Sequence, residues 1–168
     1  MNTRRILVAT AVALALAAGA WLALPGLTST PAPAVQYETL GGQSGTLEAM
    51  RGKVVLVNFW ATSCVTCVKE MPELVATHDK FHPRGYETLA VAMSYDTPEF
   101  VSHFTRTRNL PFTVAFDRSG AIAKSFGDVQ LTPTSVLINK RGEIVKRYVG
   151  QPDFAALHQL VEKLLAEA

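Results

Sequence analysis

One short run of residues constrains the fold of this chain more than any other feature. Residues 54–59 read VVLVNF, an almost uninterrupted apolar stretch that is rich in β-branched side chains. Such a run is typical of a strand buried on both faces, as in parallel sheets that helices cover on both sides. We therefore expect an α/β domain in which residues 54–59 form a central strand.

The pattern of the remaining residues agrees with this fold class. Residues 35–47 predict a short β-hairpin, residues 64–81 have helical spacing, and residues 86–93 predict a second buried strand. We further predict a helix over 97–109, a strand over 112–116, a short helix over 121–126, strands over 134–138 and 143–149, and a helix over 152–166. Strands that alternate with helices pair in parallel, whereas a terminal hairpin is antiparallel. The prediction is a central mixed sheet with helices on both faces.

The N-terminal segment differs in composition from the rest of the chain. Two arginines precede an uncharged apolar run, residues 6–24, which is long enough to cross a bilayer as a helix. Positive charge ahead of such a run predicts a cytoplasmic N-terminus and an exported remainder. We expect residues 1–26 to be a signal-anchor or a cleaved signal peptide, residues 27–34 to be a Pro-rich linker, and residues 35–168 to be one folded domain.

The charge balance excludes one class of partner. The chain has 16 Lys+Arg against 14 Asp+Glu, and two of the basic residues, Arg4 and Arg5, lie in the predicted export segment. The predicted domain is therefore formally neutral, and it lacks the basic excess that binds nucleic acid. We expect no nucleic-acid partner.

The candidate chemistry lies directly after the central strand. Cys64 and Cys67 are the only cysteines, and Cys64 lies where a helix is expected to begin, with Ser63 placed to cap it. The free N–H groups of a helix N-terminus lower the pKa of a cysteine there. Residues three apart on a helix lie about 5–6 Å apart, so the two cysteines can bond without moving the backbone. We assign Cys64 as the exposed nucleophile and Cys67 as the inner, resolving thiol.

Other uses of the same two cysteines are weaker. A structural disulfide here would close a very short loop and would contribute little stability. A zinc site would need further ligands. The histidines of the same helix, His78 and His82, lie about 16 Å or more further along it, at the end that we expect to be exposed to solvent. A Cu(I)-binding metallochaperone stays an alternative because soft thiolates bind copper, whereas a peroxidase would need a separate peroxidatic cysteine. The C-x-x-C spacing after a strand favours a redox couple.

Two segments of the domain carry a resemblance to a known family. One is RGKVVLVNFWATSCVTCVKEMPEL, which contains the cysteine pair, and the other is LTPTSVLINKRGEIVKRYVG, which contains a proline loop and a hairpin. With the strand–helix–strand unit between them, they resemble the TlpA/ResA-type membrane-anchored branch of the thioredoxin superfamily. The resemblance implies a thioredoxin-like three-layer fold with an inserted βα unit. It also implies thiol-disulfide oxidoreductase activity, with no cofactor and no metal.

The resemblance implies roles for individual residues. Cys64 and Cys67 correspond to the redox-active disulfide, and Pro133 corresponds to a cis-proline opposite it. Thr132 would bind an extended client peptide through its backbone, as a short added strand. Trp60 corresponds to a tryptophan beside the site, and we expect it to contribute to substrate binding.

Glu70 corresponds to an acidic residue that this branch carries just after the cysteines. Thioredoxins have a buried Asp in the preceding strand, and Asn58, which cannot ionise, stands in its place here. We therefore predict that Glu70 is the proton acceptor for Cys67, the alternative being a solvated helix glutamate. A carboxylate near two thiols raises their pKa, which favours a reducing couple.

The expected function is reduction of disulfides in partner proteins on the exported side of a membrane. An upstream membrane protein would supply the electrons, and apocytochromes c or copper-site assembly proteins are the expected clients. Two departures from the family pattern leave the potential and the client open. Ser63 replaces a tryptophan, and the dipeptide VT between the cysteines lacks the proline that related reductases often have.

Overall fold

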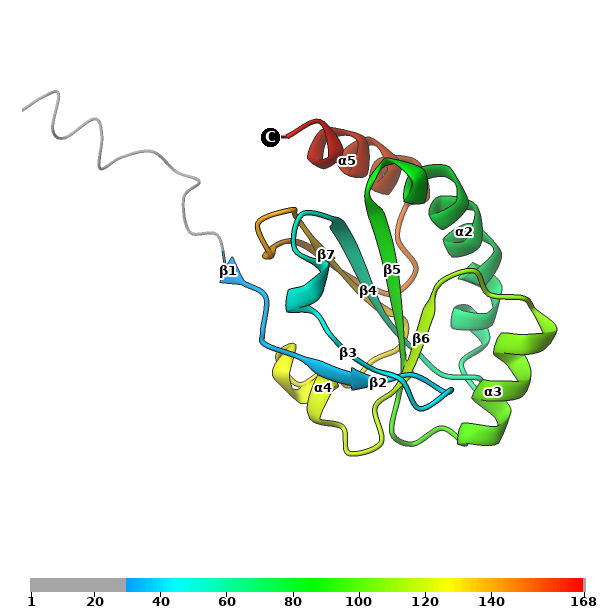
Figure 1. Cartoon of the computed structure of the whole chain (residues 1–168). Helices are drawn as coiled ribbons and strands as arrows, with labels where there is room; N and C mark the ends of the chain where they lie inside the picture. The colour runs from blue at the N-terminus through cyan, green and yellow to red at the C-terminus, as the bar shows by residue number, and fades with distance from the viewer. Residues whose placement is uncertain (1–29, 168) are drawn as a thin grey trace, which may run out of the picture.

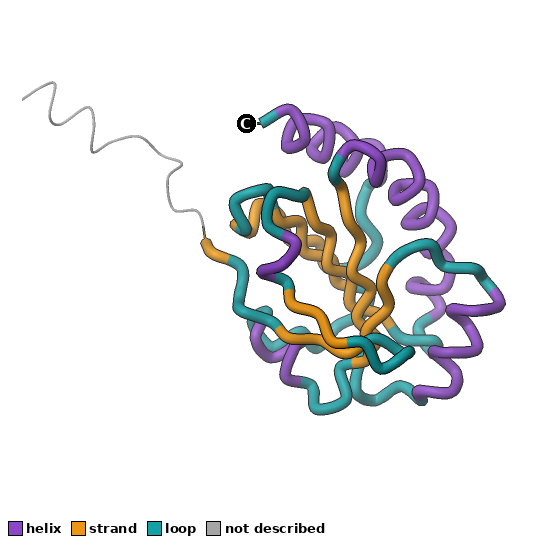
Figure 2. Tube along the Cα trace, viewed as in Figure 1, coloured by secondary structure: helices purple, strands orange, loops and turns teal. Residues whose placement is uncertain are grey.

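The computed structural model describes residues 30–167, so the predicted export segment lies outside the described residues. A six-stranded sheet has the order β1-β8-β7-β4-β5-β6, and β2 and β3 form a separate two-stranded sheet (Figure 1). The strands are β1 (Thr30–Pro31), β2 (Gln36–Glu38), β3 (Ser44–Thr46), β4 (Val54–Trp60), β5 (Tyr86–Ala92), β6 (Thr113–Phe116), β7 (Thr134–Ile138) and β8 (Glu143–Val149). The helices are η1 (Glu48–Met50), α2 (Val65–Phe81), η2 (His82–Arg84), α3 (Pro98–Thr107), α4 (Ala121–Ser125) and α5 (Phe154–Ala166). Figure 2 shows the helices, strands and loops along the chain in different colours.

The central strand is β4, as the apolar run predicts. It pairs in parallel with β5 and antiparallel with β7, and every one of its residues is buried. Successive side chains of a strand point to opposite faces. The even-numbered apolar residues of β4 accordingly belong to one core cluster and the odd-numbered residues to a second. Asn58 has an even number, so it points toward the first cluster, which also contains α2 residues.

Helices cover both faces of the sheet, which confirms the predicted three-layer α/β fold. The first cluster joins β4 to α2 through Leu74 and to α5 through Leu157 and Val161. The second cluster joins the sheet to α4 through Ile122 and Ala123. Figure 1 shows α2 and α5 on one side of the sheet and α4 on the other. Leu157 and Val161 are four residues apart, so they lie on the same face of α5.

The sheet begins earlier than the sequence predicts. Thr30 and Pro31 form β1, which pairs antiparallel with β8 at Ile144 and Glu143, inside the segment expected to be a linker. A proline is tolerated in such a strand because β1 lies at the edge of the sheet. Two residues without an alternating apolar pattern give no strand signal, since this pairing depends on backbone groups alone.

The end of α2 also differs from the prediction. His78, which was expected at a solvent-exposed end of the helix, is only 4% exposed. Its ring contacts the rings of Tyr86 and Phe112, with centroid distances of 6.3 and 5.6 Å. Because β5 and the segment before β6 pack over this end of α2, the position is interior. Helical spacing alone does not reveal that β5 and the segment before β6 cover this end of the helix.

Candidate active site

The two cysteines lie at the junction between β4 and α2. Cys64 is the N-cap residue of α2, and its Sγ accepts a hydrogen bond from the backbone N–H of Cys67 at 3.1 Å. The prediction that Ser63 caps the helix is wrong. The sulfur of the following residue, Cys64, accepts the capping hydrogen bond, and Ser63 is exposed. The Cα atoms of the pair are 5.2 Å apart, and the sulfur atoms are bonded at 2.14 Å.

The two sulfur atoms differ in accessibility. Cys64 is partly exposed, whereas Cys67 has no exposed surface and belongs to the first core cluster. One turn of helix is enough to produce this difference, because Cys64 precedes the helix and Cys67 lies on its sheet-facing side. A second protein can therefore reach Cys64 but not Cys67.

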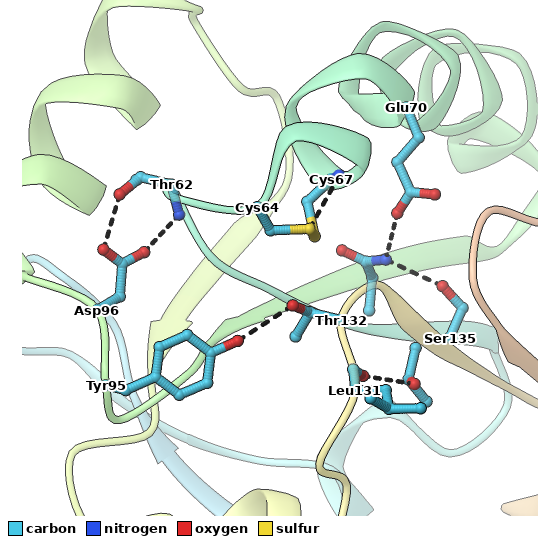
Figure 3. Close-up of a disulfide and its surroundings, with 11 residues drawn as sticks. Thr62, Cys64, Cys67, Glu70, Tyr95, Asp96, Leu131, Thr132 and Ser135 are labelled. Atoms are coloured by element: carbon cyan, nitrogen blue, oxygen red, sulfur yellow. Dashed lines mark hydrogen bonds between the residues drawn. A yellow bond between two sulfur atoms is a disulfide. The ribbon is translucent and has the colours of Figure 1, made fainter.

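A buried polar network lies behind Cys67. Glu70 and Asn58 are both fully buried, and Nδ2 of Asn58 donates to Oε1 of Glu70 at 3.0 Å and to Oγ of Ser135 at 2.9 Å. Figure 3 shows the Glu70 carboxylate beside Cys67, pointing from the helix toward the side where Ser135 lies. Ser135 lies on β7, directly opposite Asn58 of β4. Three elements thus supply one network beside the inner thiol.

The network gives Glu70 an unusual ionisation. Burial raises the pKa of Glu70 to about 7, and the hydrogen bond from Asn58 opposes that rise only in part. Within residues 30–167, Oε2 of Glu70 and Oδ1 of Asn58 have no hydrogen-bond partner. The alternative of a solvated helix glutamate is wrong, and this carboxyl changes charge near neutral pH within one helical turn of Cys67.

The proline loop lies on the outer side of the cysteines. The Thr132–Pro133 peptide bond is cis, as the resemblance implies, and Pro133 leads directly into β7 beside β4. Oη of Tyr95 lies 3.0 Å from Oγ1 of Thr132, and the hydroxyl of Thr134 donates to the Leu131 carbonyl at 2.7 Å. Figure 3 shows Tyr95 and Thr132 meeting below Cys64. The loop is therefore fixed from both sides.

Asp96 fixes the segment that carries Cys64. Its carboxylate accepts hydrogen bonds from the backbone N–H of Thr62 at 2.5 Å, from the Thr62 hydroxyl at 2.7 Å and from the backbone N–H of Thr97 at 2.8 Å. Thr97 occupies the N-cap position of α3, but its side chain makes no capping hydrogen bond. One carboxylate thus connects the loop after β5 to the loop that leads into the cysteine pair.

Trp60 is buried in the core cluster that also contains Cys67. The side chain has no exposed surface, and its ring packs against Phe104 with a centroid distance of 5.2 Å. Strand alternation turns this side chain toward the core beneath α3. It therefore offers no exposed surface for the substrate contact that the sequence predicts. Its observed contacts are packing contacts.

Three exposed apolar side chains belong to the segments that form the site. Val65 follows Cys64, Leu131 precedes the proline loop, and Tyr95 contacts that loop; their exposed fractions are 68%, 64% and 59%. Large exposed apolar residues gathered near a reactive group are typical of a surface that binds another protein. An extended client segment would meet apolar contacts there.

Sequence reasoning missed Tyr95, Asp96 and Ser135. Tyr95 and Asp96 follow the end of β5, and the cysteines follow the end of β4, its parallel neighbour. The carboxyl ends of parallel strands meet at one edge of a sheet, so this topology could have indicated the first two. Ser135 required the register of the antiparallel β4–β7 pair, which the sequence does not specify.

This fold, with a C-x-x-C disulfide at a helix N-terminus and a cis-proline beside it, defines a thioredoxin-type protein. The chain belongs to the Redoxin family, whose profile matches residues 27–161. It is 34% identical over 133 residues to the thiol-disulfide oxidoreductase ResA of Bacillus thuringiensis subsp. konkukian, which covers 79% of this chain and 76% of the relative.

Solved structures give the same result. The solution structure of a protein from Neisseria meningitidis, assigned as a thioredoxin, is 41% identical and has a TM-score of 0.77, covering 83% of this chain and 93% of that one. A crystal structure of a thiol:disulfide interchange protein, assigned as DsbE, from Chlorobium tepidum is 29% identical with a TM-score of 0.75, covering 82% and 97%. The protein is a thiol-disulfide oxidoreductase of the ResA/TlpA type within the thioredoxin superfamily.

Proposed function

We propose that the protein reduces disulfides of partner proteins through Cys64 and Cys67. The Cys64 thiolate attacks one sulfur of a client disulfide, so a mixed disulfide forms and one client thiolate leaves. The Cys67 thiolate then attacks the sulfur of Cys64 and releases the second client thiolate. Two electrons pass from the cysteine pair to the client, and the Cys64–Cys67 disulfide remains.

The difference in accessibility between the two sulfur atoms carries this assignment. Cys64 is partly exposed and caps the helix, whereas Cys67 is fully buried, so only Cys64 can meet a client. Cys67 can still reach Cys64, because their Cα atoms are 5.2 Å apart. We assign Glu70 as the group that accepts the Cys67 proton, since it is a titratable group in the network behind that thiol.

The reducing direction follows from the charge of Glu70. When the carboxyl is ionised, it raises the pKa of a nearby thiol by like-charge repulsion. A less stable thiolate disfavours the dithiol form, so the couple gives up electrons more readily than the couple of an oxidant. Burial of Glu70 supports this proposal, because a low dielectric strengthens the repulsion.

Client binding is proposed to use the proline loop. Thr132 precedes the cis-proline, and its backbone would pair with an extended client segment while Leu131 and Val65 contact apolar client side chains. Trp60 is left out of this surface because it is buried. The clients are disulfide-containing proteins, and we propose apocytochromes c or copper-site assembly proteins among them.

We propose that the protein works on the exported side of the membrane, with residues 1–26 as a signal-anchor or cleaved signal peptide. The two arginines and the apolar run of residues 6–24 support this placement. Within residues 30–167 no helix is both long and apolar enough to span a membrane. An upstream membrane donor would return the couple to its dithiol form, because each turnover leaves it oxidised.

Cysteine variants test the two roles. In Cys67→Ser the mixed disulfide cannot be resolved, so covalent client complexes should accumulate, whereas Cys64→Ser should form none. Non-reducing electrophoresis followed by identification of the captured proteins measures this. Equal trapping by both variants would overturn the role assignment. The captured clients would also test the cytochrome and copper-assembly proposals.

Two further measurements test direction and the copper alternative. Thiol labelling of the resting protein in cells should find a substantial dithiol fraction, and a wholly oxidised pair in cells with an intact electron supply would contradict the reductase proposal. The alternative is a Cu(I) metallochaperone that uses the same cysteines. Copper that co-purifies tightly with protein inactive in insulin reduction would favour it.

A further inference from the structure

A second group of candidate ligand side chains lies at the other end of α2. His78 is in the last turns of α2, His82 begins η2, and Glu87 is the second residue of β5. Each offers one ligand atom, and these atoms lie within 4.8 Å of one another. Neither cysteine belongs to the group. From Cys67 to His78 the helix rises about 16 Å, so the group is separate from the redox site.

The geometry of the group follows from the local fold. His78 and His82 are four residues apart on a continuous helical path, which places them on the same face, and their rings stack with a centroid distance of 4.6 Å. Glu87 reaches the rings from the neighbouring strand, with its Oε2 3.6 Å from Nδ1 of His82. Nδ1 of His82 also lies 3.2 Å from the Tyr86 carbonyl oxygen.

Two imidazoles and one carboxylate form a donor set that suits zinc and similar ions. Tetrahedral zinc with bonds of about 2.0–2.1 Å places its ligand atoms roughly 3.3 Å apart. Since the ligand atoms lie within 4.8 Å of one another, each pair would have to approach by at most about 1.5 Å. Half of the His82 side chain is exposed, so this ring can make the adjustment without disturbing the core.

His78 is the interior member of the group, with 4% of its surface exposed. Among the residues that the structure describes, none forms a hydrogen bond with its Nδ1. A buried imidazole nitrogen without a partner costs free energy.

Lys53 occupies the position of a competing cation. Its Nζ lies 3.0 Å from Oε2 of Glu87, the same oxygen that faces His82. About half of the Lys53 side chain is exposed, so it can move into solvent. A divalent ion bound by the two imidazole nitrogens and the Glu87 carboxylate would replace the positive charge that Lys53 places beside Glu87.

We propose that His78, His82 and Glu87 bind one divalent transition-metal ion of the zinc class, in exchange for the Lys53 ion pair. Water completes the coordination on the exposed side. The ion would connect the end of α2 to β5 and stabilise the folded state through its binding free energy. It takes no part in thiol chemistry, so this site stands or falls independently of the proposed reductase function.

Zinc titration of the oxidised full-length protein in mild detergent tests the site, because the disulfide removes both thiols as ligands. Calorimetry at neutral pH should show one zinc ion bound by the wild type, and zinc should raise its melting temperature. His82→Ala should weaken binding by at least about tenfold and abolish the thermal shift. Lys53→Met should tighten binding several-fold, since it removes the competing charge.

His103→Ala is the matched control, because His103 is an exposed histidine on α3. It should bind zinc as the wild type does. Equal affinity in the wild type and His82→Ala would show adventitious zinc binding elsewhere and would overturn the proposal. Weaker binding by Lys53→Met, or no binding by the wild type at millimolar zinc, would overturn it as well. Trapping of clients by Cys67→Ser would be unaffected in each case.

Discussion

The hydrogen bond between Asn58 and Glu70 joins two side chains that have no exposed surface. Asn58 faces the first core cluster because of strand alternation, and Glu70 lies on the side of α2 that packs on the same cluster. The side-chain amide of Asn58 does not ionise, so the titratable group of this network comes from the helix. The amide holds the carboxyl in place and donates to Ser135 through the same nitrogen.

At this scale the first prediction concerns the pH dependence of stability. Burial raises the pKa of Glu70 from 4.5 to about 7, so between these values the folded state binds more protons than the unfolded state. Stability from this group is therefore full below pH 4.5 and is lost as the pH rises toward 7. Each pKa unit corresponds to about 1.4 kcal/mol, so the loss is on the order of 3 kcal/mol.

Urea unfolding of the oxidised protein between pH 4.5 and 7.5 measures this effect. The free energy of unfolding of the wild type should fall relative to Glu70→Gln as the pH rises, because the amide does not titrate. Glu73→Gln is the matched control, since Glu73 is exposed on the same helix. A difference between wild type and Glu70→Gln that stays constant over this range would contradict the predicted pKa.

Single residues differed in how far the sequence could place them. Glu70 was predicted to accept the proton of Cys67, and burial raises the pKa of its carboxyl to about 7. Trp60 was expected to contribute to substrate binding, but alternation within β4 places its side chain in the core. Ser135 gave no signal, because its partner Asn58 is distant in the chain and the register between their strands is a tertiary property.

Among the elements, two loops act together at the redox site. The loop after β5 supplies Asp96, which holds Thr62 in the segment before Cys64 through two hydrogen bonds. The same loop supplies Tyr95, which contacts Thr132 of the proline loop. Both loops follow parallel neighbours, β4 and β5, so the sheet brings them to one edge.

The second prediction concerns this connection. Asp96→Ala should lower the free energy of unfolding by about 1.5–3 kcal/mol, because hydrogen bonds to a charged group are lost and the Thr62 N–H loses its acceptor. The alkylation rate of Cys64 in the dithiol form should change as well, because the segment before it is no longer fixed.

Glu99→Ala is a suitable control, since Glu99 is an exposed acidic residue of α3. It should change stability by less than about 0.5 kcal/mol. Urea unfolding and the rate of reaction with iodoacetamide measure the two effects. An Asp96→Ala protein with unchanged stability and unchanged Cys64 reactivity would show that the loop connection is dispensable.

The elements themselves were largely predictable where burial imposes an apolar pattern. The strands β4 and β7 are buried runs and the helix α5 has a buried apolar face, so their positions came from the sequence nearly residue by residue. The strand β1 pairs through its backbone alone, and the N-cap of α2 is a cysteine instead of the expected serine. Neither feature depends on apolar periodicity, and so neither could be read from it.

For the whole molecule, redox state and stability are linked by a thermodynamic cycle. The unfolded chain has nearly the potential of an unconstrained C-x-x-C pair, because its disulfide closes only a very short loop. A folded couple that is more reducing than this reference must stabilise the disulfide form over the dithiol form. The proposed reductase direction is therefore a statement about global stability.

The third prediction is that the oxidised protein unfolds at a higher urea concentration than the reduced protein at pH 8. In Glu70→Gln the gap should narrow, because loss of the buried negative charge lowers the pKa of the thiols and stabilises the dithiol form. Glu73→Gln should keep the wild-type gap. Paired unfolding curves in oxidising and reducing buffers measure all three proteins. A reduced protein that is more stable than the oxidised protein would mean that folding makes the couple more oxidising than the unconstrained pair, which would contradict the proposed reductase direction.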